Sequence, residues 1–194
     1  NMTNRGETDY YQEISKKLVS QIKSNLSTYA ENIEVIPLVG EINTGLRTLI
    51  ANNYVISDAL KRYADKVDKL HLDIAIIVEN RETEKFELII FEIKKVKNLG
   101  LKKLSQLIGY CLVSRAKYGV LMNVDKSISD NFSIILDSDT NLTKISRLLD
   151  DGGALTHELG VMVWNSKTHN IEYTNSGGFK SIAELIEKVE KNIM

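Results

Sequence analysis

Residues 86–95 read FELIIFEIKK, a run of large apolar side chains that ends in one carboxylate and two lysines. A strand with both faces buried typically carries an apolar run of this kind. Buried charges are costly unless they are paired or bound to a metal ion. The sequence therefore predicts a buried strand over 86–96, with Glu92 and Lys94 beside a group that compensates their charge.

The stretch before it, DIAIIV, begins with Asp73 and is joined to the first by the polar loop ENRETEK. In an antiparallel hairpin with Val78 opposite Glu87, Asp73 lies directly opposite Glu92. Directly opposed residues have Cβ atoms about 4.5–5.5 Å apart, and like charges there are destabilising. Strand alternation puts Glu92 and Lys94 on one face of the sheet, and a slip of one residue would send one carboxylate to the other face.

Length and composition indicate a single globular domain over 1–194. The chain has 194 residues, of which 43% are hydrophobic and 26% are charged, values that are ordinary for a soluble protein. No apolar run approaches the roughly 18 residues that a membrane helix needs, so no membrane association is expected and a cytoplasmic protein fits best. A single cysteine, Cys111, rules out an intrachain disulfide and a cysteine-built zinc site.

The charge distribution is more informative than the net charge of −1. The segment 93–124 contains no aspartate or glutamate and holds seven basic residues: Lys94, Lys95, Lys97, Lys102, Lys103, Arg115 and Lys117. An asymmetry of this kind indicates an anionic partner. The alternative is that these are solvated lysines on the surface of a helix.

Apolar residues at helical or alternating spacing predict the remaining elements. The expected helices lie at 8–30, with Thr8 or Asp9 as N-cap, at 54–67 from near Ser57, at 101–117, at 140–153, and at 181–193 with Ser181 as N-cap. The third helix is expected to bury the stripe Leu101, Leu104, Ile108 and Leu112. The other expected strands lie at 33–39, 118–124, 132–136, 159–165 and 170–175. Pro37 restricts the first of them to a sheet edge or to an irregular stretch.

Two carboxylates and a lysine at the end of a buried hairpin suit a hard divalent cation. Mg²⁺ is typically held by one or two carboxylates and takes further ligands from water and substrate phosphates. It polarises a phosphoryl oxygen and lowers the pKa of a bound water, while an adjacent lysine stabilises the developing charge. This set of residues therefore predicts the hydrolysis of a phosphodiester.

Asp73, a gap of 18 residues, and then Glu92-Ile93-Lys94 resembles the PD-(D/E)XK nuclease superfamily, which includes many restriction endonucleases and Holliday junction resolvases. The resemblance implies an α/β fold with a restriction endonuclease-like core, a central mixed β-sheet flanked by helices. That core would span 8–124, and 125–194 would be a C-terminal extension of the same domain. In sequence order the family core has a helix, a three-stranded meander, a helix and a further strand.

The resemblance also implies roles for individual residues. Asp73, Glu92 and the backbone carbonyl of Ile93 would bind Mg²⁺ or Mn²⁺, and Lys94 would be the catalytic lysine. Glu13 on the first helix and Gln106 on the helix after the motif would support them. Contacts to DNA are expected from Lys95, Lys97, Lys102, Lys103, Tyr110 and Lys117, of which Lys103, Gln106, Tyr110 and Lys117 are expected to share one helical stripe.

The function expected from these features is a metal-dependent deoxyribonuclease, an endonuclease acting on DNA. Cutting both strands of a duplex calls for two sites, which favours a homodimer, although no residue pattern requires one. Two alternatives are open: a nucleic-acid-binding module on the same fold that does not cleave, and a regulatory protein whose acidic and basic trio is structural. In the latter, Glu92 and Lys94 would form an ion pair reaching water, and Asp73 would cap the preceding turn.

Overall fold

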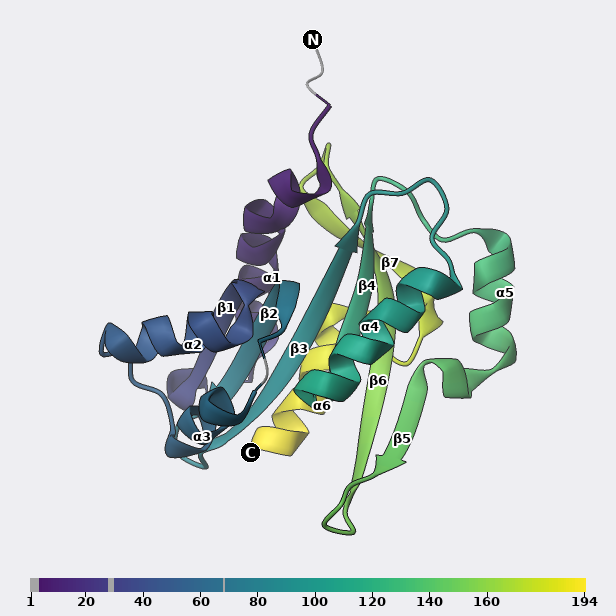
Figure 1. The fold of residues 1–194 in the computed structure, drawn as a ribbon. Coiled ribbons are helices and arrows are strands. Elements are labelled where there is room, and N and C mark those ends of the chain that lie inside the picture. The colour runs from purple at the N-terminus through teal and green to yellow at the C-terminus, as the bar shows by residue number, and fades with distance from the viewer. Residues whose placement is uncertain (1–3, 28–29, 68) are drawn as a thin grey trace.

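The structure, a computed structural model, describes residues 4–27, 30–67 and 69–194. It is an α/β fold in which helices flank an open, mixed sheet of seven strands (Figure 1). The strands are β1 (Ile33–Glu41), β2 (His71–Asn80), β3 (Lys85–Lys94), β4 (Tyr118–Val124), β5 (Lys144–Leu148), β6 (Ala154–Asn165) and β7 (Asn170–Gly177). The helices are α1 (Tyr11–Asn25), α2 (Ile42–Ala51), α3 (Asp58–Lys66), α4 (Leu101–Ser114), α5 (Asp130–Ser138) and α6 (Ile182–Ile193). No helix in these ranges is long and apolar enough to cross a membrane.

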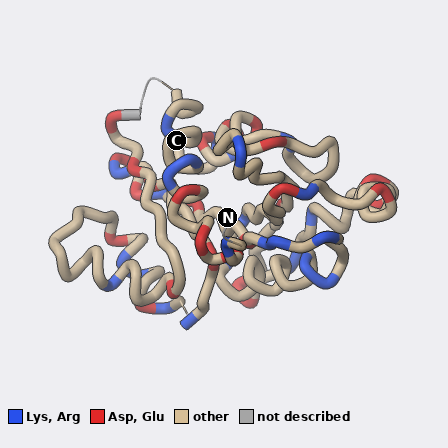
Figure 2. Tube along the Cα trace, turned by 90° about the horizontal axis from the view of Figure 1, so that it is seen from above, with Lys and Arg blue, Asp and Glu red and all other residues tan. Residues whose placement is uncertain are grey.

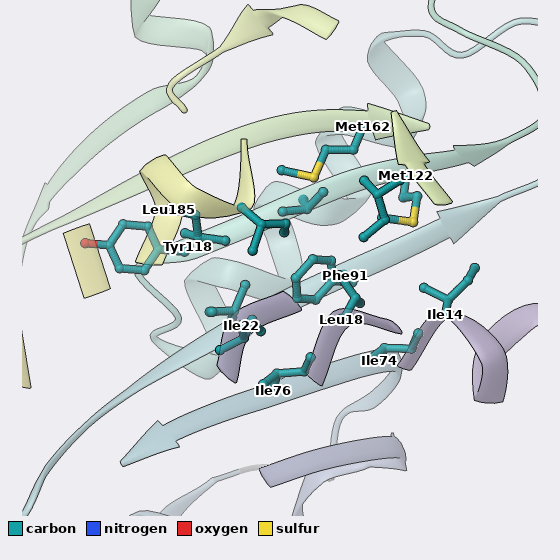
Figure 3. Packing of buried hydrophobic residues seen from close by; sticks show 14 of the residues in the cluster. Ile14, Leu18, Ile22, Ile74, Ile76, Phe91, Tyr118, Met122, Met162 and Leu185 are labelled. Atoms are coloured by element: carbon teal, nitrogen blue, oxygen red, sulfur yellow. The ribbon is translucent and has the colours of Figure 1, made fainter. Parts of the chain in front are cut away.

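The sheet separates two hydrophobic clusters, one on each face. On the α1 face, helices α1 and α6 pack on alternate residues of the central strands, and Figure 3 shows Leu18 and Ile22 against Ile76 and Phe91. On the α4 face, helices α2, α3, α4 and α5 cover the other set of strand residues, including Ile90 and Leu121. Because both faces are covered, the central strands carry the continuous apolar runs seen in the sequence.

The predicted hairpin is present in the predicted register. Strands β2 and β3 are antiparallel, with Val78 opposite Glu87 and Ile74 opposite Phe91. Among the described residues, strand β1 pairs with β2 alone and forms one edge of the sheet. Pro37, which lacks a backbone N–H, therefore lies on an edge strand as predicted.

Residues 125–194 extend the same sheet. Strand β6 runs parallel to β4, and its opposite edge pairs with β5 over its first half and with β7 over its second half. The predicted hairpin of β6 and β7 is confirmed. Helix α6 begins after Ser181, whose hydroxyl accepts the backbone N–H of Glu184, so the predicted N-cap is also confirmed.

Two elements expected between β4 and β6 were predicted with the wrong type. The expected strand is a helix, and the expected helix contains a strand. The expected strand 132–136 lies in helix α5, where Ser129 caps the first turn and Phe132 and Leu136 are buried one turn apart. The expected helix 140–153 contains a short 3₁₀ turn and strand β5, which pairs antiparallel with the first half of β6. The free edge of β6 determines the second outcome, because a strand there completes backbone hydrogen bonds that a helix cannot.

Four further details of the helices differ from the prediction. The helical turns of the N-terminal segment begin at Glu7, one residue before Thr8, because the 3₁₀ turn η1 (Glu7–Tyr10) runs directly into α1. Helix α2 was not predicted. In α4 the buried stripe is Leu104, Leu107, Cys111 and Ser114, whereas Leu101 is 46% exposed. The helix ends at Ser114, so Lys117 does not lie on it.

Candidate active site

The candidate site lies where β3 ends, at the edge of the sheet where the parallel strands β3, β4 and β6 have their carboxyl ends. Ligands of open α/β sheets typically bind outside such strand ends. Glu92 pairs in register with Leu121, a residue of the α4-face cluster, so its side chain points to that face. Lys94, two residues on, points to the same face.

Glu92 and Lys94 form a buried ion pair. The Nζ of Lys94 lies 2.7 Å from Oε1 of Glu92, and the two side chains are 9% and 2% exposed. This pair is almost fully buried, in contrast to the ion pair reaching water that the structural alternative predicts. The second oxygen of Glu92, Oε2, is buried and has no hydrogen-bond partner among the described residues.

The electrostatics of the pair reflect its burial. Burial raises the pKa of the Glu92 carboxyl, the ammonium of Lys94 works against this shift, and the charge of Asp73 adds to it. For Lys94 burial acts to lower the pKa, but the hydrogen bond and charge of Glu92, together with Glu7 and Asp73, outweigh it and raise the pKa. Lys94 therefore stays charged at neutral pH. An unpartnered carboxylate oxygen beside it is suited to accept a hydrogen bond or bind a cation.

Asp73 contacts the same segment through its backbone. Its Oδ2 accepts the N–H of Ile93 at 2.8 Å, and its Oδ1 accepts the hydroxyl of Tyr11 at 2.7 Å. The predicted register thus brings Asp73 beside the Glu92-Ile93-Lys94 segment, and its carboxylate contacts the neighbouring strand rather than capping the turn before it. Each of its oxygens keeps a further lone pair for another ligand.

Glu7 is a site residue that the sequence did not reveal. Its Oε2 accepts the N–H of Lys95 at 3.1 Å, and its Oε1 lies 3.4 Å from the hydroxyl of Tyr11. Its charge contributes to the raised pKa of both Glu92 and Lys94. The available signal was the spacing of Glu7 and Tyr11, which places them on one face of a helix that begins before Thr8.

Glu13, the residue expected to support the site from the first helix, is engaged elsewhere. Its two carboxylate oxygens lie 3.2 Å from Arg5 and 3.4 Å from Nδ1 of His169, which lies in the turn between β6 and β7. The structure therefore joins Glu13 to the N-terminal segment and to that turn. It brings Glu7, and not Glu13, to the end of β3.

A second residue missed by the sequence is Asn123, which lies opposite Lys94 on β4 and is fully buried. Its amide bonds both backbone groups of Val96: Nδ2 donates to the carbonyl at 2.9 Å and Oδ1 accepts the N–H at 3.1 Å. Asn123 thereby holds the segment that follows Lys94. This contact fixes the direction in which the chain leaves β3.

The residues expected to contact DNA separate into two groups. Lys95, Lys97 and Lys102 are exposed and Lys103 is partly exposed, all in or just after the loop that follows β3. Figure 2 shows a row of blue segments on one side of the N-terminal end of the chain, with red segments close to it. The Nζ of Lys95 also bonds the carbonyl of Arg5.

Gln106 and Lys117 are placed differently from the lysines of that loop. Gln106 is exposed on α4, where its amide donates to the hydroxyl of Tyr110 at 3.1 Å. Lys117 precedes β4 at the opposite end of the sheet and lies 3.2 Å from Glu87, a buried carboxylate. The expectation of one stripe joining Lys103, Gln106, Tyr110 and Lys117 is therefore wrong, because helix α4 ends before its last member.

The predicted metal ligands belong to the chemical class that hard cations prefer. No group of three or more His, Cys, Asp or Glu side chains in the described ranges is placed to hold a metal ion. The predicted set is of another kind, since it has two carboxylates, Asp73 and Glu92, and a backbone carbonyl, that of Ile93. Carboxylates and carbonyls are ligands of Mg²⁺ and related hard cations, and the unpartnered Oε2 of Glu92 is an oxygen that such an ion would satisfy.

No family model, curated protein or solved structure compared with the chain matches it. The interpretation of the site therefore depends on its own geometry.

Proposed function

We propose that the chain is a metal-dependent deoxyribonuclease that hydrolyses phosphodiester bonds in DNA as an endonuclease. The observation that carries this proposal is the buried Glu92–Lys94 pair, which has one carboxylate oxygen without a partner and lies beside Asp73 at the end of β3. Buried ionisable groups with shifted pKa values at strand ends are candidates for functional sites. Structural ion pairs give the same perturbation, so the proposal requires an activity test.

The fold supports a restriction endonuclease-like core of the PD-(D/E)XK superfamily as part of this proposal. Helix α1, the meander of β1, β2 and β3, helix α4 and strand β4 follow in the order that the resemblance implies. Helices α2 and α3 are inserted between β1 and β2. Strands β5, β6 and β7 extend the sheet beyond the core.

Each residue of the site has a distinct part in the proposed chemistry. When Mg²⁺ or Mn²⁺ is bound, it polarises a phosphoryl oxygen and lowers the pKa of a coordinated water. Asp73, Glu92 and the carbonyl of Ile93 would hold the ion. Lys94, which stays protonated, would offer a fixed positive charge to the phosphate where negative charge develops. Burial of the pair strengthens this interaction because little water screens it.

The exposed lysines after β3 would bind the DNA backbone. Lys97, Lys102 and Lys103 lie in or next to the loop that begins directly after the site. Contacts of this kind are made to phosphates, and they position the duplex without reading its sequence. The proposed substrate contact is therefore electrostatic and weakens with added salt.

A second candidate function is nucleic-acid binding without cleavage. It is favoured by the contacts that both carboxylates already make within the chain. Asp73 accepts two hydrogen bonds, and Glu92 forms an ion pair with Lys94. A site of that kind does not need a metal ion for its structure. DNA binding that persists in EDTA, with no cleavage in Mg²⁺ or Mn²⁺, would support it.

A plasmid-nicking assay in Mg²⁺ or Mn²⁺ tests the proposal. Cleavage should be lost in EDTA and in Lys94→Ala, and retained in Lys85→Ala, which removes an exposed lysine from the opposite end of β3. Glu7→Gln should reduce cleavage more than Glu13→Gln, because only Glu7 contacts the end of β3. Cleavage that is indifferent to both EDTA and Lys94→Ala would refute the proposed mechanism.

A further inference from the structure

Tyr11 continues the buried stripe of α1 past the edge of the sheet. Ile14, Leu18 and Ile22 are fully buried on the α1 face, and Figure 3 shows them following one another along the sheet. Tyr11 precedes Ile14 by three residues, which is the spacing of neighbours on one helix face. The packed stripe therefore fixes where the ring of Tyr11 lies, and its hydroxyl reaches Oδ1 of Asp73 at 2.7 Å.

The phenol of Tyr11 is the hydrogen-bond donor in its contact with Asp73, because an ionised carboxylate only accepts hydrogen bonds. The hydroxyl has one hydrogen, which it gives to the nearer of its two acceptors. The nearer acceptor is Asp73, since Glu7 is 3.4 Å away.

The two hydrogen bonds to Asp73 fix the whole carboxylate. Oδ1 is held by Tyr11 from α1, and Oδ2 is held by the backbone N–H of Ile93 from β3. Because the donors come from two different elements, rotation of the carboxylate about its terminal torsion would break both bonds. The lone pairs that remain point in directions set by these partners.

We propose that Tyr11 is a positioning residue that holds Asp73 in the orientation needed to bind the metal ion. This inference rests on the proposed function, in which Asp73 is a metal ligand. Partners that orient a metal ligand typically change metal affinity or activity by about 10- to 100-fold when they are removed. Tyr11 would therefore determine the metal concentration that the enzyme requires, without contacting the substrate.

The neighbouring tyrosine provides a matched control. Tyr10 is 5% exposed, and its ring lies 4.3 Å from the guanidinium of Arg5. Tyr10→Phe and Tyr11→Phe remove the same atom from adjacent residues, but only the second removes a donor to Asp73. Binding of Mn²⁺ is measured by calorimetry on the full chain without DNA, and plasmid nicking is then measured as a function of Mn²⁺ concentration.

Tyr11→Phe is expected to raise the dissociation constant for Mn²⁺ by about 10- to 100-fold, and Tyr10→Phe is expected to leave it unchanged. Nicking by Tyr11→Phe should recover at saturating Mn²⁺, because the residue acts through metal binding. The inference is overturned if Tyr11→Phe binds Mn²⁺ as the unmodified chain does, if both variants weaken binding equally, or if nicking does not recover. If the unmodified chain neither binds Mn²⁺ nor nicks the plasmid, the proposed function fails first, and that result is distinguishable from these three.

Discussion

Replacing both members of the Glu92–Lys94 pair with methionine is expected to leave the protein as stable as before or more stable. The charged atoms lie 2.7 Å apart and the side chains are almost fully buried. Exchanging a buried ion pair for apolar residues of similar volume is often neutral or stabilising by about 1–4 kcal/mol, because the charges no longer have to leave water. Removing one partner alone destabilises by about 3–5 kcal/mol, because the other charge stays buried and unpaired.

Proton transfer sets an upper limit on the part of each single loss that comes from the unpaired charge. In Glu92→Met the unpaired Lys94 can give up its proton, which costs about 4.6 kcal/mol at pH 7 for a lysine with an ordinary pKa of about 10.4. In Lys94→Met the unpaired Glu92 can take up a proton, which costs about 3.7 kcal/mol at pH 7 for a glutamate with an ordinary pKa of about 4.3. In the two single variants, the unpaired charge should therefore lower the free energy of unfolding by up to about these amounts.

The losses of stability in Lys94→Met and in Glu92→Met depend on pH in opposite directions. Without Lys94, burial of Glu92 raises its pKa further, so the folded state holds a proton that the unfolded chain releases. The stability of Lys94→Met relative to the unmodified chain therefore falls as pH rises above about 4.3. Without Glu92, burial lowers the pKa of Lys94, so the unfolded chain holds the extra proton and the relative stability of Glu92→Met rises as pH approaches about 10.4.

Urea denaturation followed by circular dichroism, in EDTA at pH 5.5, 7 and 9, measures these differences for the two single variants and the double variant. At pH 5.5 the limit for Lys94→Met is about 1.6 kcal/mol, and at pH 9 the limit for Glu92→Met is about 1.9 kcal/mol. Single variants within about 0.5 kcal/mol of the unmodified chain at pH 7 would refute the reasoning, as would losses with the same pH trend. A double variant less stable than either single variant would show that the pair is structural.

Other predictions concern the metal and DNA. A concentration of Mn²⁺ that is 100 times its dissociation constant should raise the free energy of unfolding by about 2.7 kcal/mol; thermal denaturation should show the rise lost in Asp73→Asn and retained in Asp65→Asn, which alters an exposed residue of α3. Lys102→Gln should reduce the slope of log affinity for DNA against log salt by about 0.9, in a binding titration over several salt concentrations. Lys117→Gln should leave that slope unchanged and instead lower the midpoint of unfolding, because Glu87 is buried and loses its cation.

The central hairpin could be predicted to the residue because two independent patterns agree there. The apolar runs of β2 and β3 fix which segments are buried, and the polar loop between them fixes how far apart they pair. Val78 opposite Glu87 follows from that loop alone, and it places Asp73 next to the segment that contains Glu92. The core of the candidate site was therefore accessible from the sequence.

The region between β4 and β6 could not be predicted in the same way, because its elements are short and lie at the surface. Helix α5 buries only Phe132 and Leu136, while Ile134 within the same apolar run is 65% exposed. Strand β5 has no fully buried residue, and its Leu148 is 83% exposed. Neither periodicity is strong enough to decide between helix and strand. For residues 144–148, pairing with β6 determines that the segment forms a strand.

Glu7, and not the predicted Glu13, lies at the end of β3 because of where the first helical turns begin. A helix predicted to start at Thr8 or Asp9 leaves Glu7 in the preceding loop, where its direction is not defined. The structure begins the helical turns at Glu7, and the backbone N–H of Gly6 bonds Asp9 at the start of them. Glu7 then faces Lys95, and Glu13 faces Arg5. A start two or three residues earlier, with Gly6 rather than Thr8 or Asp9 as N-cap, brings Glu7 into the helical turns and toward β3.

On the α4 face, the charged end of β3 departs from the apolar pattern of the strand. Along the α4 face, Leu88 and Ile90 are followed by Glu92 and Lys94, although Leu121 beside them on β4 continues the apolar cluster. An apolar pair there would avoid the desolvation of two charges and of an oxygen with no partner. Departures from local consistency that reduce stability are expected at functional sites. The charges at the end of this strand therefore favour a functional role for Glu92 and Lys94. The gain in the free energy of unfolding of the double methionine variant measures the stability that the charged pair costs the protein.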